Sequence, residues 1–285
     1  MEVTRTITDI RRLVRRAKKA GQKVGFVPTL GALHDGHLSL IAQARQESNF
    51  LVVSIFLNPT QFGPGEDLNK YPHQEQQDLE LCEKAAVDAV FLPSVQQMYP
   101  VGYCTSVKVQ GLSDKLCGAH RPGHFEAVST VVAKLFNIVG PDLAYFGQKD
   151  AQQALIITRM VQDLNMPIQI RLCPTVREKN GLAMSSRNAY LTLQQRSQAA
   201  CLYRALLKGK DLIEVGQRDP QVVTEVMKKI IAQAGPCQTD YIVAVDPQTL
   251  EPVKKDSPVW LLAVVVWIGQ ARLIDNIVVD ISKAK

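Results

Sequence analysis

Short apolar runs alternate with helix-type patterns through the first 170 or so residues, and this alternation limits the possible folds of the chain most strongly. The clearest runs are KVGFVPTL, FLVVSIFL, DAVFLP, DLAYFG and IQIRLC, and a less regular one is TSVKVQG at residues 105–111. Nearly unbroken apolar runs are typical of strands that are buried on both faces. With helices between them, such strands predict a doubly wound parallel sheet covered by helices on both faces.

The pattern changes after about Pro174. Residues 193–216 and 220–235 have the spacing of two helices, and three strand-like segments, TDYIVAVD, PVWLLAVVVWIG and ARLIDNIVVDI, then follow one another directly. Consecutive strands after helices favour an α+β unit with an antiparallel sheet. We therefore expect a Rossmann-like α/β domain at residues 1–174 and a smaller α+β domain at residues 175–285.

The charge balance favours anionic ligands without choosing among them. Lys and Arg (33) outnumber Asp and Glu (27), which gives a net charge of +6. Much of the excess lies in residues 11–23, where Ile10, Leu13, Val14 and Ala17 recur at helical spacing and leave the basic residues on the outer face. A basic RNA-binding module is the non-enzymatic alternative. Only 6% of residues are aromatic and no basic segment is interleaved with stacking rings, so we expect no nucleic-acid partner.

Neither a membrane nor an oxidising compartment is expected. The most apolar run, residues 259–269, is too short to cross a bilayer and is more typical of a buried strand. The six cysteines are scattered without a CxxC pair, which argues against a disulfide framework or a zinc site. The N-terminus has no secretion-signal pattern. A cytoplasmic location is the simplest expectation.

The segment PTLGALHDGH, residues 28–37, lies between the first long apolar run and a helix-type pattern. Ligands of open parallel sheets bind beyond the carboxyl ends of the strands, where helix N-termini attract anions. Gly31 and Gly36 would allow close approach of the backbone to such a ligand. Their spacing matches half of a P-loop, but His37-Leu38 takes the place of Lys-Ser/Thr and excludes that type of kinase or ATPase.

The two histidines of this segment are three residues apart, so both rings can face one ligand. An imidazole can donate a hydrogen bond to a phosphate oxygen. A lone HxxH is more often polar surface or a core histidine, but its position after a strand and between glycines favours nucleotide chemistry. The pattern HxGH at His34–His37 resembles the signature of the nucleotidyltransferase superfamily, which includes class I aminoacyl-tRNA synthetases.

Three further segments lie where a parallel sheet presents ligands or at the boundary between the expected domains. Asn58 and Gln61 follow the second strand, Lys149 and Asp150 occupy another strand-to-helix turn, and residues 177–188 read REKNGLAMSSRN. Each alone is more often a helix cap or an ordinary loop.

Together with HxGH and with RPGHF at residues 121–125, these segments resemble the pantothenate synthetase (pantoate–β-alanine ligase) family along essentially the whole chain. The resemblance implies that ATP and pantoate form pantoyl adenylate and pyrophosphate. β-Alanine then displaces AMP to give pantothenate, the precursor of coenzyme A. A homodimer formed through the N-terminal domain is also implied.

The residues support this chemistry in their own right. The first step joins a carboxylate to a triphosphate, and the carboxylate is already ionised at neutral pH, so the site needs positive charge rather than a general base. The candidates are His34, His37, Lys149, Arg187, the helix N-terminus and a Mg²⁺ ion. No residue is assigned as a metal ligand.

The resemblance also assigns residues one by one. The positions that match ATP contacts are Leu30, Gly31, Ala32, Leu33, His34, Asp35, Gly36, His37, Gly147, Gln148, Lys149, Asp150, Val176, Met184, Ser185, Ser186 and Arg187. His37 matches the catalytic histidine, which would donate toward the leaving pyrophosphate. Residues 184–187 resemble the mobile Lys-Met-Ser-Lys-Ser-type loop, and the smaller domain is expected to close over the ATP site. Gln61 and Gln153 match pantoate-binding positions, and we expect Asn58 beside them to bind pantoate or β-alanine.

Three positions depart from the family pattern. Leu30 replaces a common Met and is nearly isosteric with it. Gln148 replaces a common Glu and so removes a negative charge beside Lys149, and Ala127 replaces a common Gly.

The alternative enzyme is another HxGH nucleotidyltransferase, for example one like pantetheine-phosphate adenylyltransferase. Its phosphate acceptor would call for further cations in place of Asn58, Gln61 and Gln153.

Overall fold

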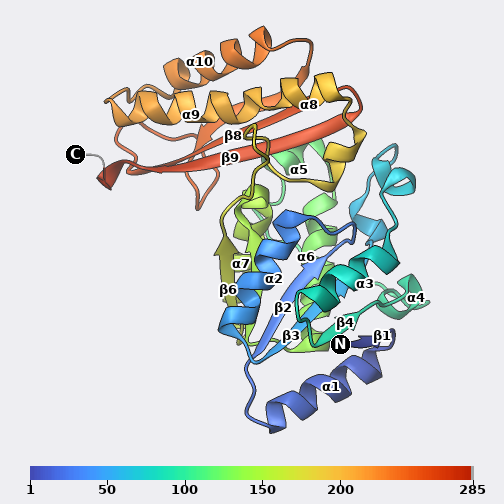
Figure 1. Ribbon diagram of the computed structural model, residues 1–285. Coiled ribbons are helices and arrows are strands. Elements are labelled where there is room, and N and C mark those ends of the chain that lie inside the picture. The colour runs from blue at the N-terminus through green and yellow to red at the C-terminus, as the bar shows by residue number, and fades with distance from the viewer. Residues whose placement is uncertain (284–285) are drawn as a thin grey trace. The chain divides into compact units, whose positions relative to one another are not determined.

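The computed structural model describes residues 1–283 (Figure 1). The chain divides into two compact units. The first unit comprises residues 1–148 and 152–174, and the second comprises residues 149–151 together with the chain from Thr175 onward.

The first unit is built on a parallel sheet whose described strands number six, in the order β1-β4-β3-β2-β5-β6. The strands are β1 (Glu2–Thr4), β2 (Val24–Thr29), β3 (Phe50–Ile55), β4 (Ala89–Phe91), β5 (Leu143–Gly147) and β6 (Gln169–Cys173). Every neighbouring pair runs parallel, with Val27 of β2 opposite Val53 of β3 at the centre. The predicted doubly wound parallel sheet is confirmed.

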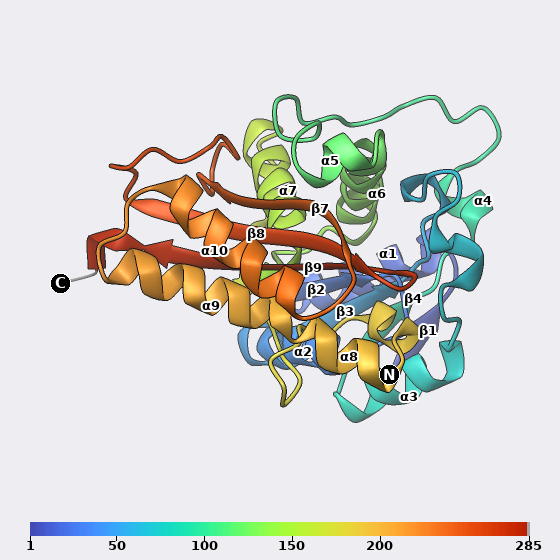
Figure 2. The same ribbon diagram turned by 90° about the horizontal axis from the view of Figure 1, so that it is seen from above.

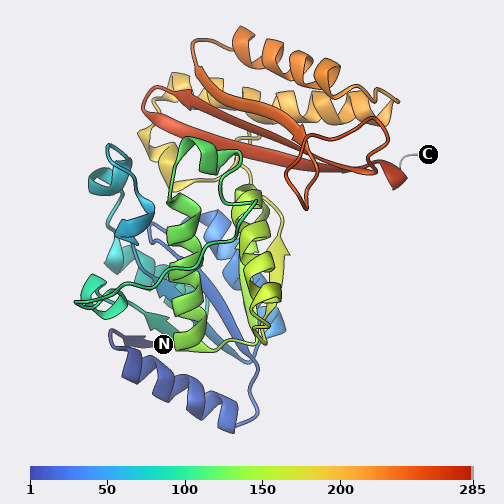
Figure 3. The same ribbon diagram turned by 180° about the vertical axis from the view of Figure 1, so that it is seen from behind.

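Helices cover both faces of this sheet, as expected from its buried strands. The described helices of this part of the chain are α1 (Ile7–Lys19), α2 (Asp35–Glu47), α3 (Glu75–Lys84), α4 (Val95–Met98), α5 (Cys117–His120), α6 (His124–Val139) and α7 (Ala151–Asp163). Helices α2 and α3 cover one face (Figure 1), while α6 and α7 cover the other, seen from behind in Figure 3. On that second face Phe136 of α6 packs edge-on against Phe26 of β2 and Phe146 of β5.

The sequence patterns misassigned two segments of the first unit. Strand β1 was not predicted, because three residues are too few to show a periodicity. Residues 105–111, a candidate strand, contain no strand. The Val107 amide donates instead to Oγ1 of Thr130 on α6, at 2.8 Å, and Val109 is buried, so the apolar alternation belongs to a connection packed on a helix.

The second unit combines helices with an antiparallel sheet, which confirms the predicted α+β architecture. Its described strands, in the order β7-β8-β9, are β7 (Gln238–Val245), β8 (Val259–Ile268) and β9 (Ala271–Asp280). The helices are α8 (Leu193–Ala199), α9 (Cys201–Glu214) and α10 (Pro220–Gln233), so the helix expected at residues 193–216 is interrupted at Ala200. Helices α9 and α10 lie side by side along the sheet (Figure 2).

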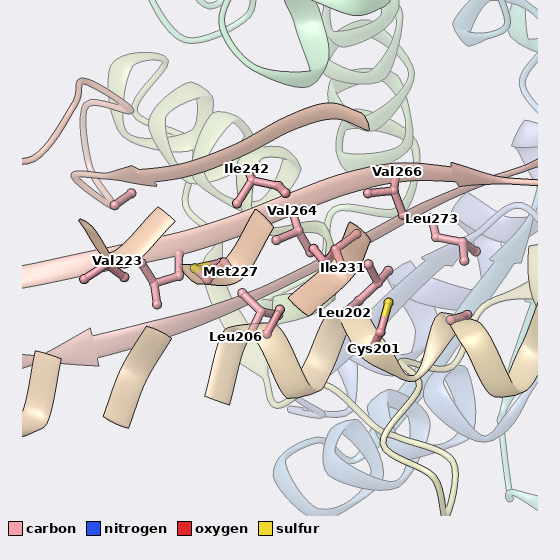
Figure 4. Close-up of a cluster of buried hydrophobic side chains, with 14 of the residues drawn as sticks. Cys201, Leu202, Leu206, Val223, Met227, Ile231, Ile242, Val264, Val266 and Leu273 are labelled. Atoms are coloured by element: carbon pink, nitrogen blue, oxygen red, sulfur yellow. The ribbon is translucent and has the colours of Figure 1, made fainter. Parts of the chain in front are cut away.

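The core of this unit lies between those helices and the sheet. Leu206 of α9 and Met227 of α10 point toward Val264 of β8 (Figure 4), and all three are fully buried. The apolar run at residues 259–269 is therefore a buried strand with its turn, as predicted. Residues 1–283 include no helix with the length and hydropathy that a bilayer crossing requires. All six cysteines lie in the described chain as free thiols.

Candidate active site

The loop after β2 is held by its own side chains and by a neighbouring helix. Oγ1 of Thr29 donates to the Ser54 carbonyl at 2.8 Å and accepts the Gly31 amide at 3.2 Å. Gly31 and Ala32 both have positive φ, at 88° and 51°. The amides of Ala32 and Leu33 donate to the carboxylate of Asp78 at 2.9 and 2.7 Å. These contacts turn the chain sharply between the strand and α2.

His34 and His37 close the first turn of α2 together. Nδ1 of His34 accepts the Gly36 amide at 3.1 Å, and Nδ1 of His37 accepts the His34 amide at 3.4 Å. The ring centroids are 4.1 Å apart. Since each Nδ1 is an acceptor, the proton of each neutral ring lies on Nε2. The structure thus brings together the two imidazoles that the spacing predicted, with Nε2 as the protonated nitrogen of each neutral ring.

Several backbone amides of this loop have partners within the protein. Those of Ala32 and Leu33 bind Asp78, and that of Gly36 binds His34. Sequence patterns miss these bonds because the acceptors are an imidazole and a carboxylate from a separate helix. The imidazole N–H groups and the positive end of the α2 dipole are features of this loop that favour an anion.

Asn58 and Gln61 lie together beyond β3, where a short 3₁₀ helix, η1 (Pro59–Gln61), begins. Nδ2 of Asn58 donates to Oε1 of Gln61 at 3.1 Å. Oδ1 of Asn58 accepts from the hydroxyls of Tyr99 at 2.8 Å and Thr60 at 2.9 Å. Because Oε1 of Gln61 is engaged as an acceptor, its Nε2 amide group is oriented as a donor. Asn58 itself is 0% exposed, whereas Gln61 is 8% exposed.

The backbone of Gln61 is held by the RPGHF segment, to which the sequence analysis gave no role. Nδ1 of His124 lies 2.8 Å from the Gln61 carbonyl, to which it donates, and a guanidinium nitrogen of Arg121 donates to the same oxygen at 3.3 Å. Arg121 also pairs with Glu66 at 2.5 Å. Burial alone would raise the pKa of Glu66, but Arg121 and the local backbone hold that pKa below its usual value.

The two adjacent glutamines of α7 have different environments. Gln152 is 7% exposed, and its side chain bonds the backbone of Cys117, Leu112 and Lys115. Gln153, the predicted pantoate contact, is half-buried one residue further along the helix. Gly147 ends β5, and Gln148 follows it in the first unit.

The second unit carries the remaining predicted residues. Val176 and Met184 are paired across a small hairpin, in which the Met184 amide donates to the Val176 carbonyl at 2.9 Å. Ser185 then caps the 3₁₀ helix η4 (Ser186–Tyr190) by accepting the Arg187 amide at 3.3 Å. Lys149 and Ser185 line the same small cavity of about 10 Å³, which is about the space that one water molecule needs.

Buried polar groups support this hairpin from beneath. Arg177 forms a two-pronged ion pair with Asp275 at 2.6 and 2.9 Å and stacks 3.7 Å over the Tyr203 ring. The Asn276 amide group donates to the Lys149 carbonyl at 2.9 Å. Within the second unit, β9 therefore holds the hairpin through Asp275 and the backbone of Lys149 through Asn276.

Asp150 lies beside Lys149 in the short 3₁₀ helix η3 (Gln148–Asp150). Within residues 1–283, no group of three or more His, Cys, Asp or Glu side chains could hold a metal ion.

Comparison with known proteins gives one consistent result. The family model for pantoate-beta-alanine ligase matches residues 2–278. A pantothenate synthetase of Moorella thermoacetica is 54% identical over 282 residues, which cover 99% of this chain and 100% of that protein. One from Fervidobacterium nodosum is 50% identical over 280 residues, which cover 98% of this chain and 100% of that protein.

Solved structures agree. Pantothenate synthetase from Thermus thermophilus matches with a TM-score of 0.93 and 43% identity, over 97% of this chain and 99% of that one. Pantoate-beta-alanine ligase from Francisella tularensis, complexed with beta-gamma ATP and beta-alanine, matches with a TM-score of 0.80 and 35% identity, over 97% of both chains. With a family model that spans nearly the whole chain and relatives about half identical over their full length, the chain belongs to the pantoate–β-alanine ligase family.

Proposed function

We propose that this chain condenses pantoate with β-alanine to give pantothenate, in an ATP-dependent reaction that passes through pantoyl adenylate and releases AMP and pyrophosphate. The observation that carries the proposal is the pair of imidazoles at His34 and His37, both set as Nε2–H donors beyond β2, in a member of this ligase family. An enzyme like pantetheine-phosphate adenylyltransferase is not favoured. The residues directly after β3 are the amides Asn58 and Gln61, where a phosphorylated acceptor would need cations, and the neighbouring Arg121 is already paired with Glu66.

In the first step, a carboxylate oxygen of pantoate attacks the α-phosphorus of ATP, and the bond to the leaving pyrophosphate breaks. Charge grows on the phosphoryl oxygens and on pyrophosphate, where hydrogen-bond donors stabilise the transition state. We assign that task to Nε2–H of His37, with His34 beside it. In the second unit we assign phosphate binding to Lys149, which shares a cavity with Ser185, and to the neighbouring Ser186 and Arg187. The proposed ATP contacts otherwise remain those given by the resemblance.

Pantoate binding is assigned to Gln61 and Gln153, whose amides can pair with its hydroxyl groups without adding charge. The role of Asn58 changes from the one expected. Because Asn58 has no exposed surface and its amide bonds Oε1 of Gln61, we propose that it orients Gln61 rather than contacting the substrate. In the second step the neutral amine of β-alanine attacks the acyl carbon, the nitrogen loses a proton to solvent, and AMP leaves with the electrons of the bond between that carbon and the phosphate oxygen.

Three further properties belong to the proposal. Mg²⁺ enters with ATP, since this ion prefers phosphate oxygens and keeps much of its water shell. The chain works in the cytoplasm, in keeping with its six free cysteines. It forms a homodimer through its first unit, as the family resemblance implied.

Purified protein tests the reaction directly. With ATP, Mg²⁺ and pantoate, steady AMP release should begin only when β-alanine is added, and pantothenate should accumulate in equal amount. A parallel assay would replace both acids with phosphopantetheine. Pyrophosphate release in that assay, with no amide product in the first, would favour the adenylyltransferase instead.

A further inference from the structure

Asp78 lies on α3 and binds the HxGH loop from 45 and 46 residues away along the chain. The residue is 1% exposed. Oδ2 accepts the Ala32 amide at 2.9 Å, and Oδ1 accepts the Leu33 amide at 2.7 Å. One planar group therefore holds two consecutive peptide units immediately before His34.

The surroundings of this carboxylate are unusual for a buried charge. Buried carboxylates are normally paired with a cation, yet the hydrogen bonds that Asp78 accepts within the described chain come from the backbone amides of Ala32 and Leu33. Burial raises its pKa, and the two amide bonds oppose that shift. A neutral side chain in this place would avoid the desolvation cost. What a carboxylate adds is a pair of strong acceptors at the spacing of two successive amides.

The segment that Asp78 holds, residues 31–33, has a backbone conformation that requires such stabilising bonds. Gly31 and Ala32 are consecutive residues with positive φ, a conformation that is strained for alanine. A methyl group at position 31 would lie 3.1 Å from Oδ2 of Asp78, so the carboxylate and the loop are closely fitted. Loss of the two bonds would allow residues 31–33 to relax toward ordinary backbone angles.

The imidazole geometry follows from the backbone at this point. Leu33 is bonded to Asp78 through its amide and leads directly into His34. The His34 amide donates to Nδ1 of His37, and Nδ1 of His34 accepts from Gly36. A shift of the 32–33 peptide would therefore displace both rings and change which nitrogen of each ring carries the proton.

We propose that Asp78 is a positioning residue for adenylate formation, because it fixes the backbone that sets His34 and His37 as Nε2–H donors toward the transferring phosphoryl group. The inference rests on the proposed function and extends it to a residue that need not touch any substrate.

The test compares two half-reactions in Asp78→Asn and Asp78→Ala. Single-turnover release of pyrophosphate from ATP and pantoate reports adenylation, whereas addition of β-alanine to supplied pantoyl adenylate reports aminolysis. Asp142→Asn is the matched control, because Asp142 also accepts a backbone amide, that of Val24 at 2.7 Å, at the amino end of β2. Thermal unfolding of each variant gives its folded fraction, and all rates refer to folded protein.

Adenylation should fall about 10- to 100-fold in Asp78→Asn, the range expected for misplaced catalytic groups, while aminolysis changes little. Asp142→Asn should leave both rates near those of the unaltered protein. Nitrogen NMR should find both imidazoles as Nε2–H tautomers in the unaltered protein and as mixtures in the Asp78 variants. Equal loss in both half-reactions, or unaltered adenylation with unaltered tautomers, would overturn the inference.

If the proposed function itself were wrong, the half-reaction assays would give a different result. The unaltered protein would then form no pantoyl adenylate, yet the NMR comparison would still report whether Asp78 sets the imidazoles.

Discussion

The backbone amide of His34, the N-cap residue of α2, donates to Nδ1 of His37 at 3.4 Å, so the second histidine of the HxGH pattern bonds back from the first turn of the helix to the first histidine. The His37 ring has a second nitrogen, Nε2, which carries the proton when the ring is neutral. One side chain thus has a structural bond through one nitrogen and a proposed catalytic bond through the other. The two roles can be separated by substitution.

Asparagine and glutamine at position 37 separate them. The amide of His37→Asn lies near the former Nδ1 and keeps the bond to the N-cap amide, whereas that of His37→Gln lies near the former Nε2 and keeps a donor toward phosphate. We expect adenylation to fall about 100- to 1,000-fold in His37→Asn, the usual effect of losing a transition-state donor, and less in His37→Gln. Loss of this bond to the N-cap amide should lower the free energy of unfolding by about 0.5–1.5 kcal/mol in His37→Ala but less in His37→Asn. Equal adenylation in the asparagine and glutamine variants would contradict this division of roles.

Tyr99 and Tyr103 offer a matched pair for testing pantoate binding. The Tyr99 hydroxyl donates to Oδ1 of Asn58, which orients Gln61. The hydroxyl of Tyr103 is buried near Thr130, and within residues 1–283 no bond from it to Asn58 or Gln61 is found. Tyr99→Phe removes a bond worth about 0.5–1.5 kcal/mol, so the KM for pantoate should rise roughly 2- to 10-fold while the KM for ATP is unchanged.

Tyr103→Phe removes a hydroxyl that does not bond Asn58, whose Oδ1 accepts from Tyr99 and Thr60, so both constants should stay at their original values. Steady-state kinetics with each substrate varied in turn measures both variants. A rise in the KM for ATP in Tyr99→Phe, or equal effects in the two variants, would count against the orientation of Gln61 by Asn58.

The sheet and the HxGH loop were predictable because their signals are local. A buried parallel strand needs several adjacent apolar residues, and a strand-to-helix turn with Gly31 and two histidines lies within ten residues. The second unit was predictable for the same reason, since β8 is one unbroken apolar run. The three-residue strand β1 carries no such signal, and its place is set by pairing with β4 at the edge of the sheet.

The supporting residues of the site could not be predicted in this way. Asp78 lies among the polar residues of α3, and its proposed role depends on two bonds to a loop more than 40 residues earlier in the chain. Arg121 reaches Gln61 across 60 residues and Glu66 across 55. Such contacts depend on how helices pack on the sheet, which periodicity in one segment does not specify. One feature of the sequence did draw attention to this supporting segment, because Arg121 and His124 are three residues apart, as His34 and His37 are.

A comparison of Gly31→Ala with Gly21→Ala tests whether adenylation depends on the close contact between the loop and Asp78. Both have positive φ, at 88° and 72°, but a methyl group at Gly21 meets nothing within 4 Å, whereas one at Gly31 lies 3.1 Å from both Asp78 and Ile55. Each change to alanine should lower the free energy of unfolding by about 1–2 kcal/mol through backbone strain. Only Gly31→Ala should also reduce adenylation, because the crowded methyl group displaces the loop. Chemical denaturation and single-turnover assays measure the two effects, and equal activity in the two variants would show that the loop tolerates the contact.

Glu178 gives the second unit a predictable response to acid. The Arg196 guanidinium, which bonds both its carboxylate oxygens at 2.8 Å, holds the pKa of Glu178 below its usual value, with help from Asn188 and against the opposing effect of burial. A lowered pKa in the folded state contributes stability above the unfolded value of about 4.3, and this contribution is lost as the pH falls through the folded value.

Arg196→Met removes the donors but keeps the aliphatic stem. Arg196 is 44% exposed, so the free energy of unfolding should fall by no more than about 1 kcal/mol at pH 7. The difference in unfolding free energy between the variant and the unaltered protein should shrink below about pH 4.3, because protonation of Glu178 removes from the unaltered protein the interaction that the variant already lacks. Urea unfolding at several pH values measures this difference, with Arg204→Met, at an exposed arginine of α9, as the control for loss of a positive charge. A difference that stays constant from pH 7 to pH 3 would mean that the Glu178–Arg196 pair does not set the acid response.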